Sequence, residues 1–282
     1  MSLAGKLFRF FLYSNLFIAC CATLMVYQTC QLLLHDRPDI YFACFVFFGT
    51  VCSYSFHWYL TPPDANSFSD RMLWLSKNRN IHGALFLIGA CGAVVSGLFL
   101  LEFWKWLVLA AFITFLYSAP KVPYPYFKQL KKVALGKTIL LAVVWTYVTT
   151  VLPLIMSRQS WQPIFTLFAA GRFFFVYAIC ILFDYRDREH DRSLGIRSLI
   201  TWLSKKGINY LFMVSLLAYA GFTVAMFQHG LTWLSVLVLL APAVIAAALY
   251  SYAQKNFSDF LYYFILDGLM ALPAIFALII NR

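Results

Sequence analysis

The sequence predicts an all-α membrane protein, and its composition and the length of its apolar runs support that fold class. Apolar residues form 62% of the 282 residues and charged residues only 12%, whereas soluble domains hold roughly half apolar and about a quarter charged residues. The apolar residues lie in long runs, and a helix needs about 20 such residues to cross a bilayer. Since the short segments of alternating polarity that typify a membrane β-barrel are missing, we expect a helical bundle.

Nine apolar runs are long enough to span the membrane, and we expect them to form one polytopic domain over residues 1–282. With approximate bounds, the runs are 10–34, 40–60, 81–101, 104–119, 138–156, 164–183, 208–227, 231–252 and 260–280. The first run follows Lys6 and Arg9, as in a signal peptide. It is too long for the apolar region of a signal peptide, so we interpret it as a retained helix.

The positions of the basic residues predict which side of the membrane each loop faces. A formal charge of +11 would suggest nucleic acid in a soluble protein, but in a membrane protein the short cytoplasmic loops keep Lys and Arg. If the N-terminus is cytoplasmic, most of the 22 basic residues fall inside, above all in the connections 61–80, 120–137 and 184–207. We therefore expect a cell-membrane protein with its N-terminus inside, its C-terminus outside, the lipid bilayer around it and no nucleic-acid partner.

Three aspartates, Asp184, Asp187 and Asp191, lie close together after the sixth run. If the helix continues through them, their spacing puts all three on one face. Such a face could bind Mg²⁺, which prefers oxygen ligands, while Arg188 and Arg192 could meet phosphate oxygens. The alternative is a solvated loop whose charges pair with one another, and such exposed pairs contribute little to stability.

Two motifs resemble those of the UbiA superfamily of intramembrane prenyltransferases. Residues 184–191 read DYRDREHD, which fits the family's second aspartate-rich motif, DxxDxxxD, and the GIRS sequence at 195–198 follows it as in the family. Tyr117 and Lys121 supply the Tyr-x-x-x-Lys pattern that the family carries after its fourth helix. The nine runs and the placement of both motifs on the inner side extend the resemblance over nearly the whole chain.

This resemblance implies a UbiA-like helical bundle with a cytoplasm-facing cavity. Family members bind a prenyl diphosphate through Mg²⁺, ionise it to an allylic cation, and transfer the prenyl group to a lipophilic, often aromatic, acceptor. Diphosphate leaves only if its growing negative charge is stabilised, which metal ions and basic side chains provide. The implied roles are Mg²⁺ binding by Asp184, Asp187 and Asp191, diphosphate binding by Lys121, Arg188 and Arg192, and catalysis by Tyr117 with Lys121.

The family's first aspartate-rich motif, NDxxDxxxD, is degenerate in this chain. The second run ends with SYSFHWYLTPPD at 53–64, so His57 and Thr61 stand where ligand aspartates are expected. Neither side chain is a usual Mg²⁺ ligand. Asp64 and Asp70 are nearby but imperfect substitutes, and we keep His57 and Asp64 as tentative site residues.

Two charged residues fall inside predicted spans and are also tentative site residues. Arg172 lies twelve residues before Asp184, or roughly 18 Å along a helix, so it cannot join the aspartate cluster. It either lines a cavity or makes structural hydrogen bonds. Asp267, early in the ninth run, either reaches the mouth of the cavity or caps polar groups of a neighbouring helix.

The leading hypothesis is a Mg²⁺-dependent prenyltransferase. A noncatalytic protein that binds an isoprenoid lipid, or that serves as a membrane scaffold, is the alternative, because the first motif is altered. A transporter that uses Arg172 and Asp267 is disfavoured, because the sequence has no clear internal repeat or pair of broken helices.

Overall fold

The fold was obtained as a computed structural model that describes residues 2–61, 69–122, 124, 136–193 and 198–280. This described part is helical and has no strand. Nine of its helical segments are long and apolar enough to cross a membrane. The predicted fold class is therefore confirmed.

Each spanning segment corresponds to one of the predicted runs. In chain order, they are α2 (Leu16–Thr29) continued by the π-helical η1 (Cys30–Leu34), α3 (Ile40–Tyr59), α5 (Arg79–Leu98), α6 (Trp104–Ser118) flanked by η2 (Leu101–Phe103) and η3 (Ala119–Lys121), α8 (Lys137–Thr146) continued by η5 (Tyr147–Val151) and α9 (Leu152–Met156), α10 (Pro163–Ser193), α12 (Lys205–Ala225) with η6 (Met226–His229), α13 (Trp233–Ala253), and η7 (Leu261–Leu266) continued by α14 (Asp267–Ile280). The helices α1 (Leu3–Tyr13), α4 (Asp70–Lys77) and α11 (Leu199–Trp202) lie outside these segments.

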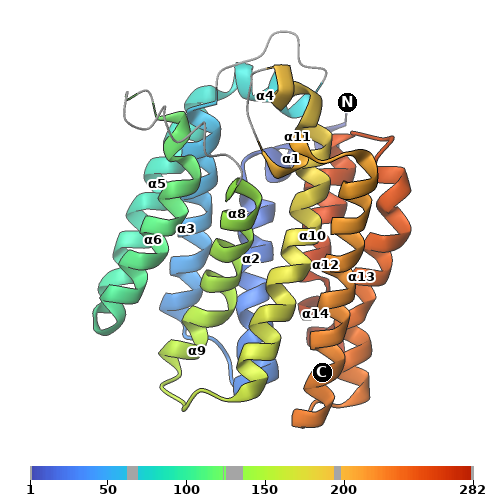
Figure 1. Ribbon diagram of the computed structural model, residues 1–282. Coiled ribbons are helices and arrows are strands. Elements are labelled where there is room, and N and C mark those ends of the chain that lie inside the picture. Colours follow the sequence, from blue (N-terminus) through green and yellow to red (C-terminus); the bar gives the residue numbers. More distant parts are fainter. Residues whose placement is uncertain (1, 62–68, 123, 125–135, 194–197, 281–282) are drawn as a thin grey trace.

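The spanning helices pack side by side in a closed ring. Going round it, α2 packs on α3, α3 on α6, α6 on α8, α8 on α10, α10 on α12, α12 on α13, α13 on α14, and α14 again on α2, while α5 packs along α3. Figure 1 shows α1, α4 and α11 gathered at one end of the bundle, which we call the α4 end.

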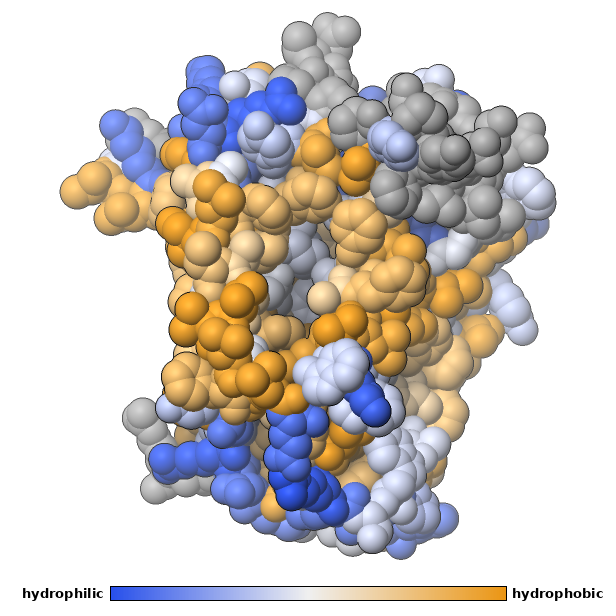
Figure 2. Space-filling model, turned by 90° about the vertical axis from the view of Figure 1, so that its left-hand side faces the viewer, coloured by the Kyte–Doolittle hydropathy of each residue, from blue (hydrophilic) through white to orange (hydrophobic). Residues whose placement is uncertain are grey.

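The outer surface has the polarity of a membrane protein. Figure 2 shows an apolar band between two hydrophilic rims on the face that it presents. Large apolar side chains of the spanning helices are exposed, for example Leu87 and Val94 of α5 and Leu217 of α12, each by more than half. Because exposed apolar side chains on this scale are unfavourable in water, the surface indicates an integral membrane protein.

The start of the first span differs from the predicted 10–34. Helix α1 ends at Tyr13, Asn15 adopts the left-handed conformation (φ 68°), and the spanning helix begins at Leu16. Asparagine tolerates this conformation better than most residues, and its side-chain oxygen accepts a hydrogen bond from Arg71 Nη2 at 2.6 Å. The apolar run therefore covers two helices, because a distant arginine stabilises the turn between them.

The sixth spanning helix is longer than predicted. Helix α10 has 31 residues and continues to Ser193, so the connection expected at 184–207 begins as helix. Two arginines of its last turns bind backbone oxygens of α11 and its C-terminal cap: Arg188 Nε donates to the Ile200 carbonyl at 3.0 Å, and Arg192 Nη2 donates to the Thr201 carbonyl at 2.9 Å. These bonds join α11 to the end of α10.

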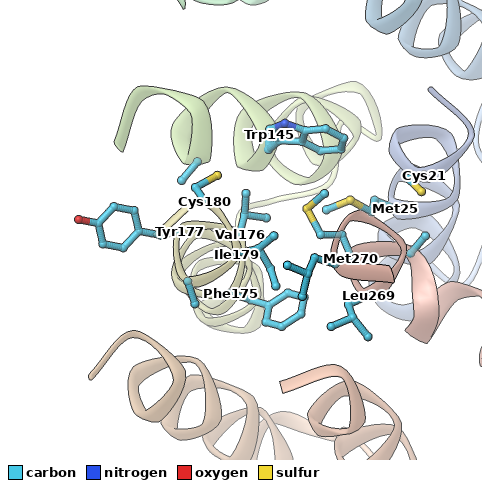
Figure 3. Close-up of a cluster of buried hydrophobic side chains, with 14 of the residues drawn as sticks. Cys21, Met25, Trp145, Phe175, Val176, Tyr177, Ile179, Cys180, Leu269 and Met270 are labelled. Carbon is cyan, nitrogen blue, oxygen red and sulfur yellow. The ribbon is translucent and has the colours of Figure 1, made fainter. Parts of the chain in front are cut away.

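The apolar core lies where the inner faces of the ring meet. Figure 3 shows Phe175 and Ile179 of α10 gathered with Met25 of α2 and Met270 of α14, and with Trp145 of α8 on the other side of the cluster. All five are at most 6% exposed. This packing fixes the rotation of α10 about its own axis. It therefore also fixes the direction in which the charged side chains at the end of α10 point.

Arg172 lies in this buried region and joins three segments without any carboxylate. Its Nη1 donates to the carbonyls of Met25 and Thr149 at 3.0 and 2.9 Å and to the Thr29 hydroxyl at 2.7 Å. Its Nη2 donates to Gln28 Oε1 at 2.6 Å. These contacts tie α10 to α2 and to η5, and they are of the kind expected for the structural role rather than the cavity-lining one.

The π-helical geometry explains how Arg172 finds these acceptors. A π turn interrupts the i→i−4 hydrogen-bond ladder of an α-helix, and Thr149 lies inside η5. Its carbonyl accepts from both Thr29 Oγ1, at 2.7 Å, and Arg172. The π-helical segment η5 thus provides oxygen acceptors for the buried guanidinium of Arg172, which would otherwise be costly in an apolar interior.

We expect Arg172→Met to destabilise the protein. The change leaves several buried acceptors unpaired, each of which costs about 1–3 kcal/mol, so the free energy of unfolding should fall by roughly 3 kcal/mol. Unfolding of the purified protein in mixed micelles measures this. Arg37→Met, at an exposed position, is the matched control and should change stability by no more than about 0.5 kcal/mol. Equal effects of the two substitutions would contradict the role given to Arg172.

Gly89 allows α5 to approach α3 closely. A Cβ atom at this position would lie 2.6 Å from the backbone nitrogen of Cys52 and 2.8 Å from the carbonyl oxygen of Phe48. Both atoms belong to the backbone of α3, so the helices would have to move apart. The contact that holds α3 beside α5 therefore depends on glycine, as at many helix interfaces in membranes.

Gly89→Ala should lower the free energy of unfolding by about 1–3 kcal/mol, the usual cost of overpacking. Gly221→Ala in α12 is the control, because a Cβ atom there meets nothing within 4 Å. The control should be neutral or slightly stabilising, since alanine favours helix more than glycine does. Micellar unfolding titrations on both variants compare them, and a stable Gly89→Ala protein would show that the helices separate without cost.

Candidate functional site

The three predicted aspartates lie on the last turns of α10 at the α4 end. Asp184 accepts a short hydrogen bond from Thr138 Oγ1 of α8. Asp187 accepts from the Nε of its neighbour Arg186 at 2.8 Å. Asp191 is buried, at 8% exposure. The helix places these carboxylates on one face because they are three and four residues apart.

Lys137, the first residue of α8, lies among the acidic residues. It interacts electrostatically with Asp184, Asp187 and Asp191, and also with Tyr117. Among the described side chains it forms no ion pair within 4.0 Å. Lys137 is therefore within electrostatic range of all three carboxylates without forming an ion pair with any of them in the described part of the chain. The sequence analysis did not assign Lys137 to the site.

A second group of polar side chains lies where α3 and η3 meet. Lys121 Nζ is 2.7 Å from His57 Nε2 and 2.5 Å from Thr61 Oγ1. His57 Nδ1 lies 3.3 Å from Ser118 Oγ, and the imidazole stacks on the ring of Tyr117 with 5.1 Å between ring centroids. The structure therefore brings His57, a tentative residue of the altered first motif, into contact with both Tyr117 and Lys121 of the Tyr-x-x-x-Lys pattern.

Electrostatic interactions connect the two groups. Lys121 acts on Asp191, and Lys137 acts on His57. The α3 side of the site is thus cationic and the α10 side is anionic. A polyanionic ligand with bound cations would find complementary charge on both sides: its anionic group would meet the α3 side, and its cations would meet the α10 side.

Three cations near these two groups, Arg71, Arg186 and Lys121, lie against aromatic rings. The Arg71 guanidinium lies 4.2 Å from the ring centroid of Trp58 and 4.1 Å from that of Tyr263. Arg186 lies 4.9 Å from the centroid of the same Tyr263 ring and donates to its hydroxyl at 2.9 Å. Lys121 lies 5.8 Å from the Trp58 ring. Cation–π contacts of this kind stabilise desolvated charge.

Arg71 belongs to α4, outside the spanning segments, yet it is only 5% exposed. Burial lowers the pKa of its guanidinium from the ordinary value. Its Nε and the Nη1 of Arg186 are buried without a hydrogen-bond partner in the described part of the chain. Sequence analysis missed this cluster, because the cations and rings come from segments far apart in the chain.

Comparison with known families identifies this arrangement. Residues 75–266 match the model of the UbiA prenyltransferase family. The chain belongs to the UbiA prenyltransferase family. The apo structure of a UbiA homolog from Aeropyrum pernix K1 has a similar fold, with a TM-score of 0.59 and 17% sequence identity over 95% of this chain and 97% of that one. No curated protein gave a match. The predicted family resemblance and the UbiA-like fold are thus confirmed.

Mg²⁺, which the UbiA family implies, fits one half of the site by its donor chemistry. The carboxylates of Asp184, Asp187 and Asp191 are the ligand type that Mg²⁺ prefers. They are not drawn together into a preassembled cluster, since the described residues hold no group of three or more potential ligands at metal-binding distance. The half at His57 and Thr61 does not fit, because a nitrogen and a hydroxyl face an ammonium group there.

Three further predicted residues, Asp70, Arg188 and Arg192, make other contacts in this UbiA protein. Asp64 lies outside the described residues. Asp70 is exposed and pairs with Arg9 at 3.0 Å, away from the first motif. The guanidinium groups of Arg188 and Arg192 donate hydrogen bonds to backbone oxygens of α11 and its C-terminal cap. Their part in diphosphate binding stays a prediction.

Asp267, the first residue of α14, lies nearer the site than Arg172 does. It interacts electrostatically with Arg71 and Arg186, the two cations of the aromatic cluster. The π-helical η7 immediately precedes it and carries Tyr263. Asp267 is thus within electrostatic range of this cluster, and its role at the site stays a prediction.

Proposed function

We propose that this UbiA family member transfers a prenyl group from a prenyl diphosphate to a lipophilic acceptor, with aromatic acceptors among the candidates. The observation that carries the proposal is the facing arrangement of the α10 carboxylates against Lys121 and Lys137. Carboxylates alone would repel a diphosphate, and cations alone would bind it without Mg²⁺. Together they suit a diphosphate accompanied by a divalent cation.

The aspartates of α10 and the two lysines would have different roles in this reaction. Mg²⁺, when bound to Asp184, Asp187 and Asp191, supplies positive charge next to the departing diphosphate. Lys121 and Lys137 hold the same group through charge-assisted hydrogen bonds. The Tyr117 hydroxyl lies within electrostatic range of Lys137 and would orient the ammonium group of that lysine. Cleavage of the allylic C–O bond leaves the electron pair on the diphosphate and yields an allylic cation.

The aromatic residues of the bundle would shelter that cation. Tyr54 lies deeper along α3 than His57, and its hydroxyl accepts from Trp145 Nε1 at 3.2 Å. Aromatic faces attract positive charge, and an enclosed site keeps water from adding to the cation. The acceptor nucleophile then forms the new C–C or C–O bond and loses a proton.

The altered first motif favours a second candidate function. His57 and Thr61 bind Lys121 where the family has ligand aspartates, so a noncatalytic protein that binds an isoprenoid lipid or serves as a scaffold would need no further change. Mg²⁺-dependent release of pyrophosphate distinguishes the two candidates. The prenyltransferase releases it from a prenyl diphosphate in the presence of a suitable acceptor, and the lipid-binding protein does not.

We expect purified protein to release pyrophosphate when given prenyl diphosphates of several chain lengths, a panel of lipophilic acceptors and Mg²⁺. Asp187→Asn should lower the rate about 100-fold or more, as expected when a group that supports developing charge is lost. Glu189→Gln is the matched control, because this carboxylate on the same turns is 79% exposed and pairs with Arg192. Inactivity of the unaltered protein across the whole panel would favour the noncatalytic function.

We also propose that the α4 end faces the cytoplasm, as the distribution of Lys and Arg favours. A protease-cleavable tag placed before residue 1 should then be protected in right-side-out vesicles and cleaved in inverted ones. The same tag placed after residue 282 should behave oppositely, because nine crossings put the two ends on different sides. A tag before residue 1 that is cleaved from outside would reverse the proposed orientation.

A further inference from the structure

The half of the site at His57 and Thr61 contains a cation that belongs to the protein. Lys121 Nζ lies 2.7 Å from His57 Nε2 and 2.5 Å from Thr61 Oγ1. Both partners stand at positions where the family's first motif has aspartates. The ammonium group thus lies against the same two positions that would otherwise hold a metal ion.

The hydrogen bonds around Lys121 are consistent with a charged ammonium group. The Thr61 hydroxyl donates to the His57 carbonyl at 2.7 Å, so towards Lys121 it acts as an acceptor. Since an ammonium group has only donors, His57 Nε2 also accepts, which puts the imidazole proton on Nδ1. That nitrogen then donates to Ser118 Oγ at 3.3 Å. Every group has a role that fits a neutral histidine and a protonated lysine.

Among the residues that the structure describes, this arrangement leaves no place for a divalent ion in contact with His57 and Thr61. A metal ion in contact with His57 and Thr61 would lie against Lys121, and like charges in a poorly solvated site repel strongly. The ligand types are also unfavourable, because Mg²⁺ keeps oxygen ligands and water and seldom takes imidazole. On the opposite face, the three aspartates of α10 retain the donor chemistry of a Mg²⁺ site.

We propose that Lys121 replaces the divalent ion of the first half-site, so that the protein binds one divalent ion per chain rather than a pair. This inference rests on the proposed function and deepens it. The diphosphate meets a lysine ammonium on the α3 side and a single hydrated ion on the α10 side. His57 and Thr61 are positioning residues that hold Lys121, and the electrostatic link between Lys121 and Asp191 joins the two halves.

The ion count can be measured with Mn²⁺ as the probe and inorganic pyrophosphate as the anion. We expect electron paramagnetic resonance to show one bound Mn²⁺ per chain in the presence of pyrophosphate, and none after Asp184→Asn combined with Asp187→Asn. Adding His57→Asp and Thr61→Asp to Lys121→Met, which supplies two carboxylates and removes the competing ammonium group, should bring the count to two. Circular dichroism and micellar unfolding verify that each variant is folded.

Substitution of the lysine gives an independent measurement. Lys121→Met should keep one Mn²⁺ per chain but weaken pyrophosphate binding roughly ten- to a hundredfold, the usual effect of losing a hydrogen bond from a charged group. Lys121→Arg keeps the charge and should recover part of that affinity. A purely structural role of Lys121 would instead change stability and leave the affinity of the folded variant unaltered.

Two Mn²⁺ ions in the unaltered protein, or one ion in the folded Lys121→Met, His57→Asp, Thr61→Asp variant, would overturn the inference. Binding of one ion without any release of pyrophosphate from a prenyl diphosphate would count against the proposed prenyltransferase and support the ion count. Absence of Mn²⁺ binding under all these conditions would overturn both. The two proposals can therefore fail separately.

Discussion

The central constraint on this protein is that each cation buried in the bundle must be stabilised where water is scarce. The chain meets it in three ways. Arg172 is surrounded by carbonyl and hydroxyl oxygens around η5. Arg71 lies against the rings of Trp58 and Tyr263, and Lys121 contacts the side chains of His57 and Thr61 at the end of α3. Each solution draws on at least two segments, so the positions of the helices and of the charges depend on each other.

The same constraint explains why the chemistry is concentrated at one end. Helix α10 runs without interruption from the Arg172 region to the aspartates, so the packing of its middle fixes the direction in which its carboxylates point. Contacts of Arg188 and Arg192 with the α11 region hold its last turns in helical form. The site is therefore a continuation of the core rather than a loop placed on top of it.

Much of the fold could be predicted from the sequence, because a spanning helix requires little more than a long apolar run. The aspartate face was also predictable, since it needs only helical spacing within one segment. The break at Asn15 was not, because it depends on Arg71 from another part of the chain. Nor were the partners of Lys121 or the position of Lys137, since motif spacing identifies residues within a segment but not the contacts between segments.

The turn at Asn15 links the surface of the protein to its interior. Helix α1 exposes Leu3 and Leu7, yet its end is joined through Asn15 to Arg71, and Arg71 touches the rings that flank the site. Any displacement of α1 would therefore have to carry Arg71 with it, or else break the bond to Asn15. The left-handed turn at Asn15 thus couples the position of the N-terminal helix to that of the cation beside the rings of Trp58 and Tyr263.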